Sequence, residues 1–180
     1  MPDPKLLGGP TQDEIMAVSL SKLGLRTNDT VLEIGCGTGK VSVAMAKQAK
    51  KVYAVDRRPE AIPVAAETAR QAGVSTIEFS CIDAMDFLIK NQVFDCAFLG
   101  GTKNLAAILP VLAKKVRRTI VINAVMVSTL ERAVVTLKEL GLFTEVVQVQ
   151  VSRSSDIAGS IMFRPIDPVY IIVARGAACS

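Results

Sequence analysis

The stretch "VLEIGCGTGKVSVAMA", residues 31–46, decides the fold that we expect for this chain. An apolar run gives way to glycine at alternate positions, Gly35, Gly37 and Gly39, and then resumes with the spacing of a helix. Glycine serves where the backbone needs a positive φ or must come close to a ligand. The stretch therefore predicts a strand, a tight turn and a helix, with bare amides in the turn that suit a carboxylate or a phosphate.

Outward from this turn, strand-like segments alternate with helix-like segments. Strands are expected at 30–35, 51–56, 75–81, 93–99 and 119–124, and helices at 38–49, 59–72, 105–115 and 127–140. Two further β-rich runs, 143–151 and 167–174, are separated by residues 152–165, which we expect to form a loop, so the two runs pair antiparallel. The pattern predicts one α/β domain over residues 1–180, a Rossmann-like, mixed seven-stranded sheet with an antiparallel C-terminal hairpin and helices on both faces.

The composition narrows the class of protein. Hydrophobic residues make up 50% of the 180 residues, which is rich enough to suggest apolar surface buried between subunits. No apolar run approaches the roughly 20 residues that cross a bilayer, and the start "MPDPKLLGGP" has no signal-peptide core, so we expect a cytoplasmic protein without membrane contact. Cys36, Cys81, Cys96 and Cys179 are then expected to be reduced thiols that serve as small apolar residues.

The chain contains no histidine, and this restricts its chemistry. It excludes His-ligated metal sites, Ser-His-Asp triads and imidazole acid–base catalysis, so we expect no metal and identify no general acid or base. The net charge of +4 favours an anionic partner. Nucleic acid is one such partner, although two tyrosines and no tryptophan leave few side chains to stack on exposed bases. A small polycarboxylate or phosphate ligand explains the charge equally well.

The sequence of the glycine turn indicates which cofactor it could bind. The nicotinamide pattern G-x-G-x-x-G and the Walker pattern both fail at Lys40, where each requires a glycine. What remains is the pattern acidic-x-G-x-G-x-G, from Glu33 to Gly39, which resembles the first motif of the Rossmann-like methyltransferases that bind S-adenosylmethionine. The resemblance implies cofactor contacts from Glu33, Gly35, Cys36, Gly37, Thr38 and Gly39.

Acidic residues at the next two strand ends support a nucleoside cofactor. Asp56 ends the second predicted strand, where a carboxylate can accept hydrogen bonds from both ribose hydroxyls. Asp83 and Ala84 follow the third strand, where such methyltransferases commonly contact the adenine. Each residue alone also fits an ordinary turn or helix start. Together, at successive strand ends, they indicate that S-adenosylmethionine lies across this edge of the sheet.

The acceptor side has weaker candidates. Gly100, Gly101 and Lys103 follow the fourth predicted strand and could hold substrate carboxylates, although a tight strand-to-helix turn explains the glycines equally well. Arg153 and Arg164 flank the predicted loop 152–165, which could fold over the carboxyl end of the sheet and bring both guanidinium groups to substrate carboxylates. Solvated loop charges are the alternative for these arginines.

Five segments together resemble the small precorrin C15-methyltransferases of cobalamin synthesis. They are "GGPTQDEI" (8–15), "EIGCGTGKVSVAMA" (33–46), "VYAVDRRPEAI" (52–62), "FLGG" (98–101) and "VSRSSDIAGSIMFRPIDPVYII" (151–172). The resemblance implies a decarboxylating C-methylation of cobalt-precorrin-6B, a polycarboxylate tetrapyrrole. It also implies that Thr11, the turn 35–39, Asp56 and Ala84 contact S-adenosylmethionine, and that the protein is a homotetramer.

Other functions remain open at this point. A methyltransferase acting on a ring nitrogen of tRNA or another nucleic acid would share the cofactor motifs. A cofactor-binding protein without catalysis, or a dehydrogenase with an irregular glycine pattern, belongs to a different class. The absence of histidine is compatible with the precorrin reading, because the methyl donor carries its own leaving group and an enamine-like carbon of the substrate provides the nucleophile.

Overall fold

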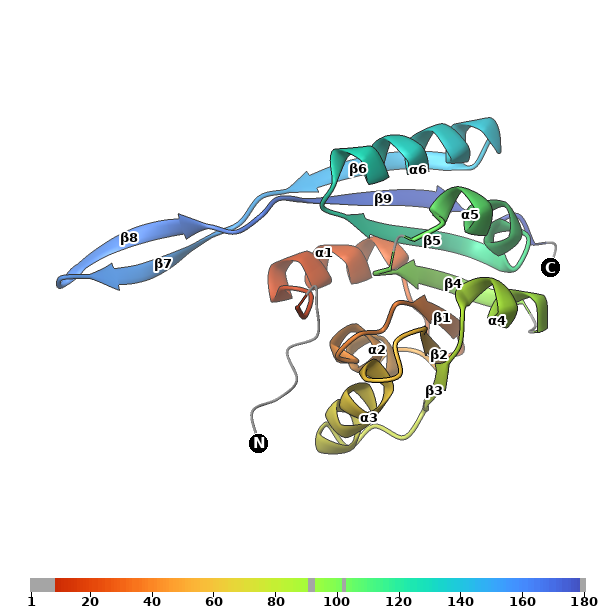
Figure 1. Cartoon of the computed structure of the whole chain (residues 1–180), viewed down its shortest axis with the longest axis horizontal. Coiled ribbons are helices and arrows are strands. Elements are labelled where there is room, and N and C mark those ends of the chain that lie inside the picture. The colour runs from red at the N-terminus through yellow and green to blue at the C-terminus, as the bar shows by residue number, and fades with distance from the viewer. Residues whose placement is uncertain (1–8, 91–92, 102, 179–180) are drawn as a thin grey trace.

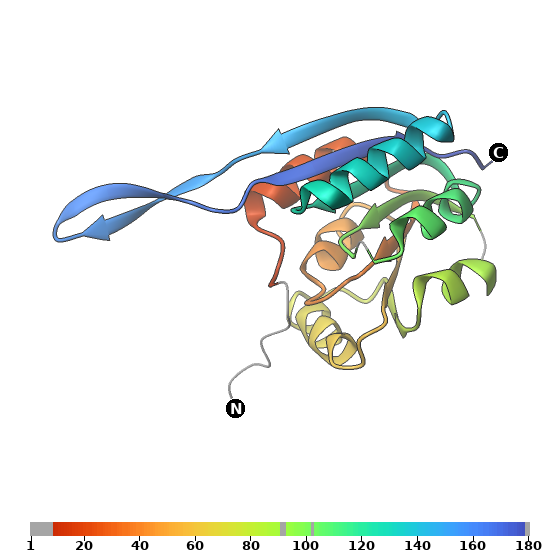
Figure 2. The same ribbon diagram turned by 45° about the horizontal axis from the view of Figure 1, so that its top comes forward.

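The computed structural model describes residues 9–90, 93–101 and 103–178 (Figures 1 and 2). Its helices are α1 (Asp13–Leu23), α2 (Lys40–Ala46), α3 (Ala61–Gln71), α4 (Ala84–Lys90), α5 (Leu105–Ala113) and α6 (Val127–Glu139). Its strands are β1 (Thr30–Ile34), β2 (Lys51–Asp56), β3 (Ile77–Cys81), β4 (Phe94–Leu99), β5 (Val116–Ala124), β6 (Phe143–Val149), β7 (Ser152–Ile157), β8 (Ser160–Pro165) and β9 (Val169–Arg175).

The central sheet has the predicted mixed topology. Its strand order is β3-β2-β1-β4-β5-β9-β6, in which the first five strands pair in parallel and β9 pairs antiparallel with both β5 and β6. The chain runs outward from β1 to β3 and then returns to place β4 on the other side of β1. The strand order therefore reverses between β1 and β4, and the carboxyl ends of these two strands form the crevice where such sheets bind ligands.

Helices cover both faces of this sheet, as the alternation of segments predicted. On one face, α4, α5 and α6 pack against buried residues such as Leu32 and Ile120. On the other face, α1, α2 and α3 pack against residues such as Val31, Phe98 and Val121. None of the helices in the described residues is long and apolar enough to cross a membrane.

The expectation of a loop at 152–165 is wrong. These residues form the antiparallel pair β7–β8, which projects well beyond the rest of the molecule (Figures 1 and 2). Ala158 and Gly159 connect the two strands with φ values of 53° and 79°, the two positive φ values that a tight type I′ hairpin requires. Ala158 is not a typical residue for such a turn, and Ser, Arg and Asp dominate β7, so propensity alone did not indicate a hairpin.

Most element boundaries lie within a few residues of the predicted ones, and the larger shifts have local causes. Helix α2 begins at Lys40 instead of residue 38, because Gly39 has a left-handed φ of 78° and cannot continue a helix. Residues 84–90, to which no element was assigned, form α4, and the carboxylate of Asp83 accepts a hydrogen bond from the Met85 amide at 2.8 Å to cap it. Cys36 and Cys96 are buried and free, Cys81 is exposed and free, and Cys179 lies outside the described residues.

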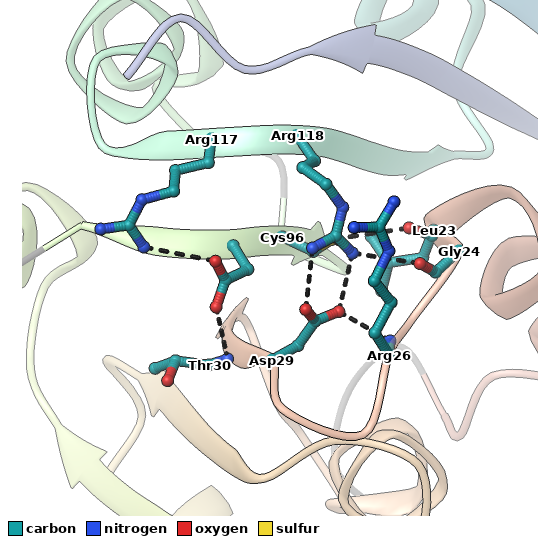
Figure 3. Close-up of polar contacts among 9 residues, drawn as sticks. Leu23, Gly24, Arg26, Asp29, Thr30, Cys96, Arg117 and Arg118 are labelled. Carbon is teal, nitrogen blue, oxygen red and sulfur yellow. Dashed lines mark hydrogen bonds and ion pairs between the residues drawn. The ribbon is translucent and has the colours of Figure 1, made fainter. Parts of the chain in front are cut away.

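A partly buried ion pair fastens the start of β1 to β5 at the edge of the sheet opposite the crevice (Figure 3). The Arg118 guanidinium donates to both carboxylate oxygens of Asp29, at 2.8 and 2.7 Å, and to the Gly24 carbonyl at 3.1 Å. Burial alone would raise the pKa of Asp29, but the hydrogen bonds from Arg118 and from the Arg26 amide hold it below its usual value. The neighbouring pair between Arg117 and Asp95 is longer, at 3.2 Å, and more exposed.

Candidate active site

The turns after β1 and β4 touch each other backbone to backbone. The Gly100 and Gly101 amides both donate to the Ile34 carbonyl, at 2.9 and 3.0 Å. Gly35 has a φ of 82°, and a Cβ placed on it would come within 2.5 Å of the Gly101 nitrogen. A side chain at this position would push the two turns apart, so glycine is required here for close approach as well as for its positive φ.

The last glycine of the turn has a different task. A Cβ on Gly39 would lie 2.8 Å from the Ala65 Cα, so this residue lets α2 approach α3. Gly39 borders neither of the cavities described below. Its predicted contact with a cofactor therefore stays a prediction, while its packing role is clear from the geometry.

Asp56, at the end of β2, is buried and fully engaged. Its Oδ2 accepts from the Gly37 amide at 3.0 Å and from Arg58 Nη2 at 2.8 Å. Its Oδ1 accepts from the Arg58 amide and from Arg58 Nε, both at 3.0 Å. Burial alone would raise the pKa of Asp56, but these hydrogen bonds keep it below its usual value. The carboxylate is thus ionised at neutral pH, and the hydrogen bond from the Gly37 amide holds it against the glycine turn.

Glu33 is a second buried acid, and its pKa is shifted in the opposite direction to that of Asp56. It lies on β1 with 1% of its surface exposed, and the Ser42 hydroxyl of α2 donates to its Oε2. Burial raises the pKa of Glu33 to about 8, in spite of that hydrogen bond, and the negative charge of Asp56 adds to the rise. A cation that enters beside Glu33 would favour its ionised form, so the carboxyl suits a positively charged ligand group.

Two cavities meet at the stacked turns, and Gly35, Arg58 and Gly100 border both. The larger has a volume of about 560 Å³, and the predicted site residues in its wall are Thr11, Glu33, Cys36, Gly37 and Thr38, beside the shared Gly35 and Gly100. The smaller, of about 290 Å³, is bordered by the predicted residues Asp56, Asp83, Ala84, Gly101 and Lys103. The fold therefore gathers residues from successive strand ends around two adjoining cavities, which together are called the crevice below.

The two arginines of the hairpin do not join this crevice. Arg153 and Arg164 are directly opposite each other in the β7–β8 register, and neither borders either of these two cavities. Arg153 instead pairs with Glu14 of α1, with nitrogen–oxygen distances of 3.0 and 2.5 Å. Because the hairpin projects outward, it does not fold over the carboxyl edge as expected. A role of these arginines in substrate binding stays a prediction.

Several residues of the larger cavity were missed at the level of sequence. Gln12 borders it from the segment before α1, and Ile166 and Asp167 border it from the base of the hairpin. Asn123 and Val125 border it from the end of β5. One signal was present: Asn123 interrupts the apolar run of β5, and a polar side chain in a buried strand usually has a specific partner.

Comparison with known proteins places this crevice in context. A family model described as a precorrin methyltransferase domain matches residues 7–175. A Methanosarcina acetivorans protein described as a probable cobalt-precorrin-6B C(15)-methyltransferase (decarboxylating) is 45% identical over 176 residues, which span 95% of this chain and 96% of the relative. A Sulfolobus acidocaldarius protein with the same description is 34% identical, over 90% of this chain and 88% of the relative.

A solved structure agrees with these matches. The crystal structure of a protein from Methanobacterium thermoautotrophicum, described as a precorrin-8w decarboxylase, has a TM-score of 0.89 and 27% identity. The match covers 97% of this chain and 98% of that one. The fold is therefore shared over nearly the whole chain, and the chain belongs to the precorrin methyltransferase family.

Proposed function

We propose that this chain is the decarboxylating methyltransferase of cobalt-precorrin-6B in cobalamin biosynthesis. It transfers a methyl group from S-adenosylmethionine to C15 of the tetrapyrrole, and the acetate side chain of ring C is lost as CO₂. The observation that carries the proposal is the double cavity at the switch point, together with the 45% identity to a relative whose description names this reaction. That relative is matched over nearly its full length, so no large part of it is missing from this comparison.

The residues of the crevice fit S-adenosylmethionine. The buried acid Glu33 and the amides of the glycine turn would hold the amino-acid end, with its ammonium and carboxylate groups. Asp56 would accept hydrogen bonds from the sugar hydroxyls, and Asp83 and Ala84 would border the base in the smaller cavity. When bound, S-adenosylmethionine supplies a methyl group on a positively charged sulfur, which departs as a neutral thioether.

Arg58 has a defined part in cofactor binding. A carboxylate has about four lone-pair positions, and the Gly37 amide and Arg58 already donate four hydrogen bonds to Asp56. A sugar diol therefore competes with the Arg58 guanidinium for the same oxygens. Because Arg58 borders both cavities, the displaced guanidinium would stay beside them, where it can pair with a substrate carboxylate.

The protein contributes mainly alignment and exclusion of water. Phe98, Val125, Ile166 and Val169 contribute apolar surface to the larger cavity. Holding the nucleophilic carbon in line with the methyl–sulfur bond can lower the barrier by about 7–11 kcal/mol. Since the substrate provides the electron pair, this step needs no protein base, in agreement with a crevice built without histidine.

The proposal also includes the oligomeric state of the protein. The β7–β8 hairpin exposes large apolar side chains far from the core, with Ile161 76% and Phe163 67% exposed. Such side chains on a projecting arm are typical of contacts between subunits. We propose that the hairpin joins four copies into a homotetramer.

Mass spectrometry of the reaction tests the proposed activity. With cobalt-precorrin-6B and S-adenosylmethionine, we expect a tetrapyrrole that has gained one methyl group and lost one CO₂. An unchanged tetrapyrrole, or methylation of tRNA instead, would overturn it. Sedimentation of a Phe163→Ser, Ile161→Ser variant tests the assembly separately: we expect a smaller species, whereas Val135→Ser on the exposed face of α6 should leave the size unchanged.

A further inference from the structure

Three consecutive apolar residues after the end of β5 are exposed. Val125 and Met126 follow β5, and Val127 begins α6. Their exposed fractions are 53%, 65% and 64%. Single exposed apolar residues are common on soluble proteins. A run of three is unfavourable in water unless it serves a function, so we ask what covers this segment, which we call the β5 lip.

The β5 lip adjoins the larger cavity. Val125 borders that cavity directly, as do Ile166 and Val169 at the base of the hairpin. The antiparallel register pairs Ala124, at the end of β5, with Tyr170 of β9. Val125 and Val169 are therefore the next residues along two neighbouring strands. Apolar side chains from the lip and from the hairpin base thus lie along the same side of the cavity.

The cavities are too small to hold both the cofactor and a whole tetrapyrrole. Their volumes, about 560 and 290 Å³, are in the range that encloses one drug-sized ligand. The proposed contacts of Glu33 and Asp56 assign that ligand to S-adenosylmethionine. A tetrapyrrole with its acetate and propionate arms is larger than this cofactor. Only its reacting edge can enter, so most of the ring has to rest on the surface outside the cavities.

The β5 lip lies on the acceptor side of the cofactor residues. Glu33 and Asp56 are on β1 and β2, and β4 separates β1 from β5. At about 4.8 Å between neighbouring strands, the backbone of β5 is about 10 Å from that of β1. A substrate that receives a methyl group from a cofactor held at β1 and β2 can therefore reach the lip with the part of its ring that stays outside.

We propose that one face of the tetrapyrrole ring packs against Val125, Met126 and Val127 while C15 reaches the methyl donor. This inference rests on the proposed function and adds to it a binding surface for the acceptor. The face of the ring is apolar and its carboxylates are on peripheral arms, so an uncharged apolar surface suits it. The unbranched side chain of Met126 can adapt to an irregular surface. Lys40 and Arg58 border the larger cavity and supply positive charge for the arms.

Continuity with the cavity favours the tetrapyrrole over a second copy of this chain as the occupant. The exposed apolar residues that we assign to subunit contacts, Ile161 and Phe163, are on the projecting hairpin and border neither cavity. Val125 belongs to the cavity wall and to the exposed run at once. The lip therefore extends the wall of the site outward, in the direction in which a substrate larger than the cavity has to extend.

A variant that carries both Met126→Ser and Val127→Ser tests this surface. Both side chains are exposed, and serine is favourable at residue 126, the N-cap of α6, so the melting temperature should not fall. With S-adenosylhomocysteine bound, each protein is titrated with cobalt-precorrin-6B and the absorbance of the tetrapyrrole is followed. We expect the variant to bind the tetrapyrrole about 10- to 100-fold more weakly and S-adenosylhomocysteine equally well. Val135→Ser is the matched control on α6, and Met126→Leu should retain tight binding.

The outcomes separate this inference from the proposed function. If the unaltered protein binds the tetrapyrrole but forms no methylated, decarboxylated product with S-adenosylmethionine, the proposed function fails. If it does not bind the tetrapyrrole, both proposals fail. Equal affinity of the double variant and the unaltered protein for the tetrapyrrole refutes the β5 lip as a binding surface. A smaller species in sedimentation also refutes it, because the lip would then be a contact between copies of this chain.

Discussion

Glu33 should make the stability of this protein depend on pH in a direction unusual for a carboxylate. Its pKa rises from the usual value of 4.5 to about 8 in the folded chain, because the side chain is buried beside Asp56. Between these two values the folded state holds a proton that the unfolded state has lost. The contribution of Glu33 to the free energy of unfolding is therefore fully present below pH 4.5. It falls by about 1.4 kcal/mol per pH unit as the pH rises toward 8.

The perturbation that isolates this effect is Glu33→Gln. Glutamine has the same shape and can still accept the hydrogen bond from the Ser42 hydroxyl, but it does not titrate. Relative to Glu33→Gln, we expect the unaltered protein to lose about 3 kcal/mol of unfolding free energy between pH 5.5 and 7.5. All other titrating groups are common to both proteins, so their contributions cancel in this difference.

Urea unfolding at several pH values measures this difference directly. If the free energies of the two proteins change in parallel with pH, then Glu33 does not hold its proton in the folded state and the reasoning from burial is refuted. Calorimetry gives a second reading: the cationic S-adenosylmethionine should favour ionised Glu33, so binding at pH 6.5 should release about one proton in the unaltered protein and none in Glu33→Gln.

Three further predictions follow from the geometry. Arg118→Ala leaves the buried Asp29 carboxylate without its partner and should lower the free energy of unfolding in urea by about 3–5 kcal/mol. Arg117→Ala removes the more exposed pair and should lower it by less than about 1 kcal/mol. Equal losses in the two variants would contradict the role of burial. Gly39→Ala brings its Cβ against Ala65 and should cost about 3–4 kcal/mol, while Gly141→Ala, with a similar φ of 68° but open space around it, should cost only about 1–2 kcal/mol. Asp56→Asn should weaken S-adenosylmethionine binding about 10- to 100-fold by calorimetry, and unchanged binding would remove Asp56 from the cofactor site.

The sequence was sufficient for the parts of the fold in which local pattern and tertiary structure agree. The stretch 31–46 predicts β1, the turn and α2, because alternating glycines between an apolar run and a helical pattern have few other structural explanations. The antiparallel pairing of β6 with β9 also follows, since no helix fits between them. The residues at successive strand ends were found because topology alone brings the carboxyl ends of parallel strands together.

What the sequence did not predict depends on tertiary contacts. The strand β7 has little β propensity, and its pairing with β8 is what makes residues 152–165 a hairpin. The position of Arg153 depends on Glu14, a residue 139 positions earlier, and no local pattern indicates that ion pair. Asn123 is a single polar residue in an apolar strand, and its contact with Ser19 of α1, 104 positions earlier, is visible only in three dimensions.

The contact between the turns after β1 and β4 limits how this enzyme can diversify. A side chain at Gly35 would displace the β4 turn, because its Cβ would lie 2.5 Å from the Gly101 nitrogen, and a Cβ at Gly101 would lie only 3.3 Å from the Gly35 Cα. A descendant that rebuilds the β4 turn for a new acceptor would have to keep glycine at position 35 or separate the two turns. Evolutionary change in acceptor preference is thereby directed to the end of β5 and the base of the hairpin, which border the same cavity but lie away from this contact.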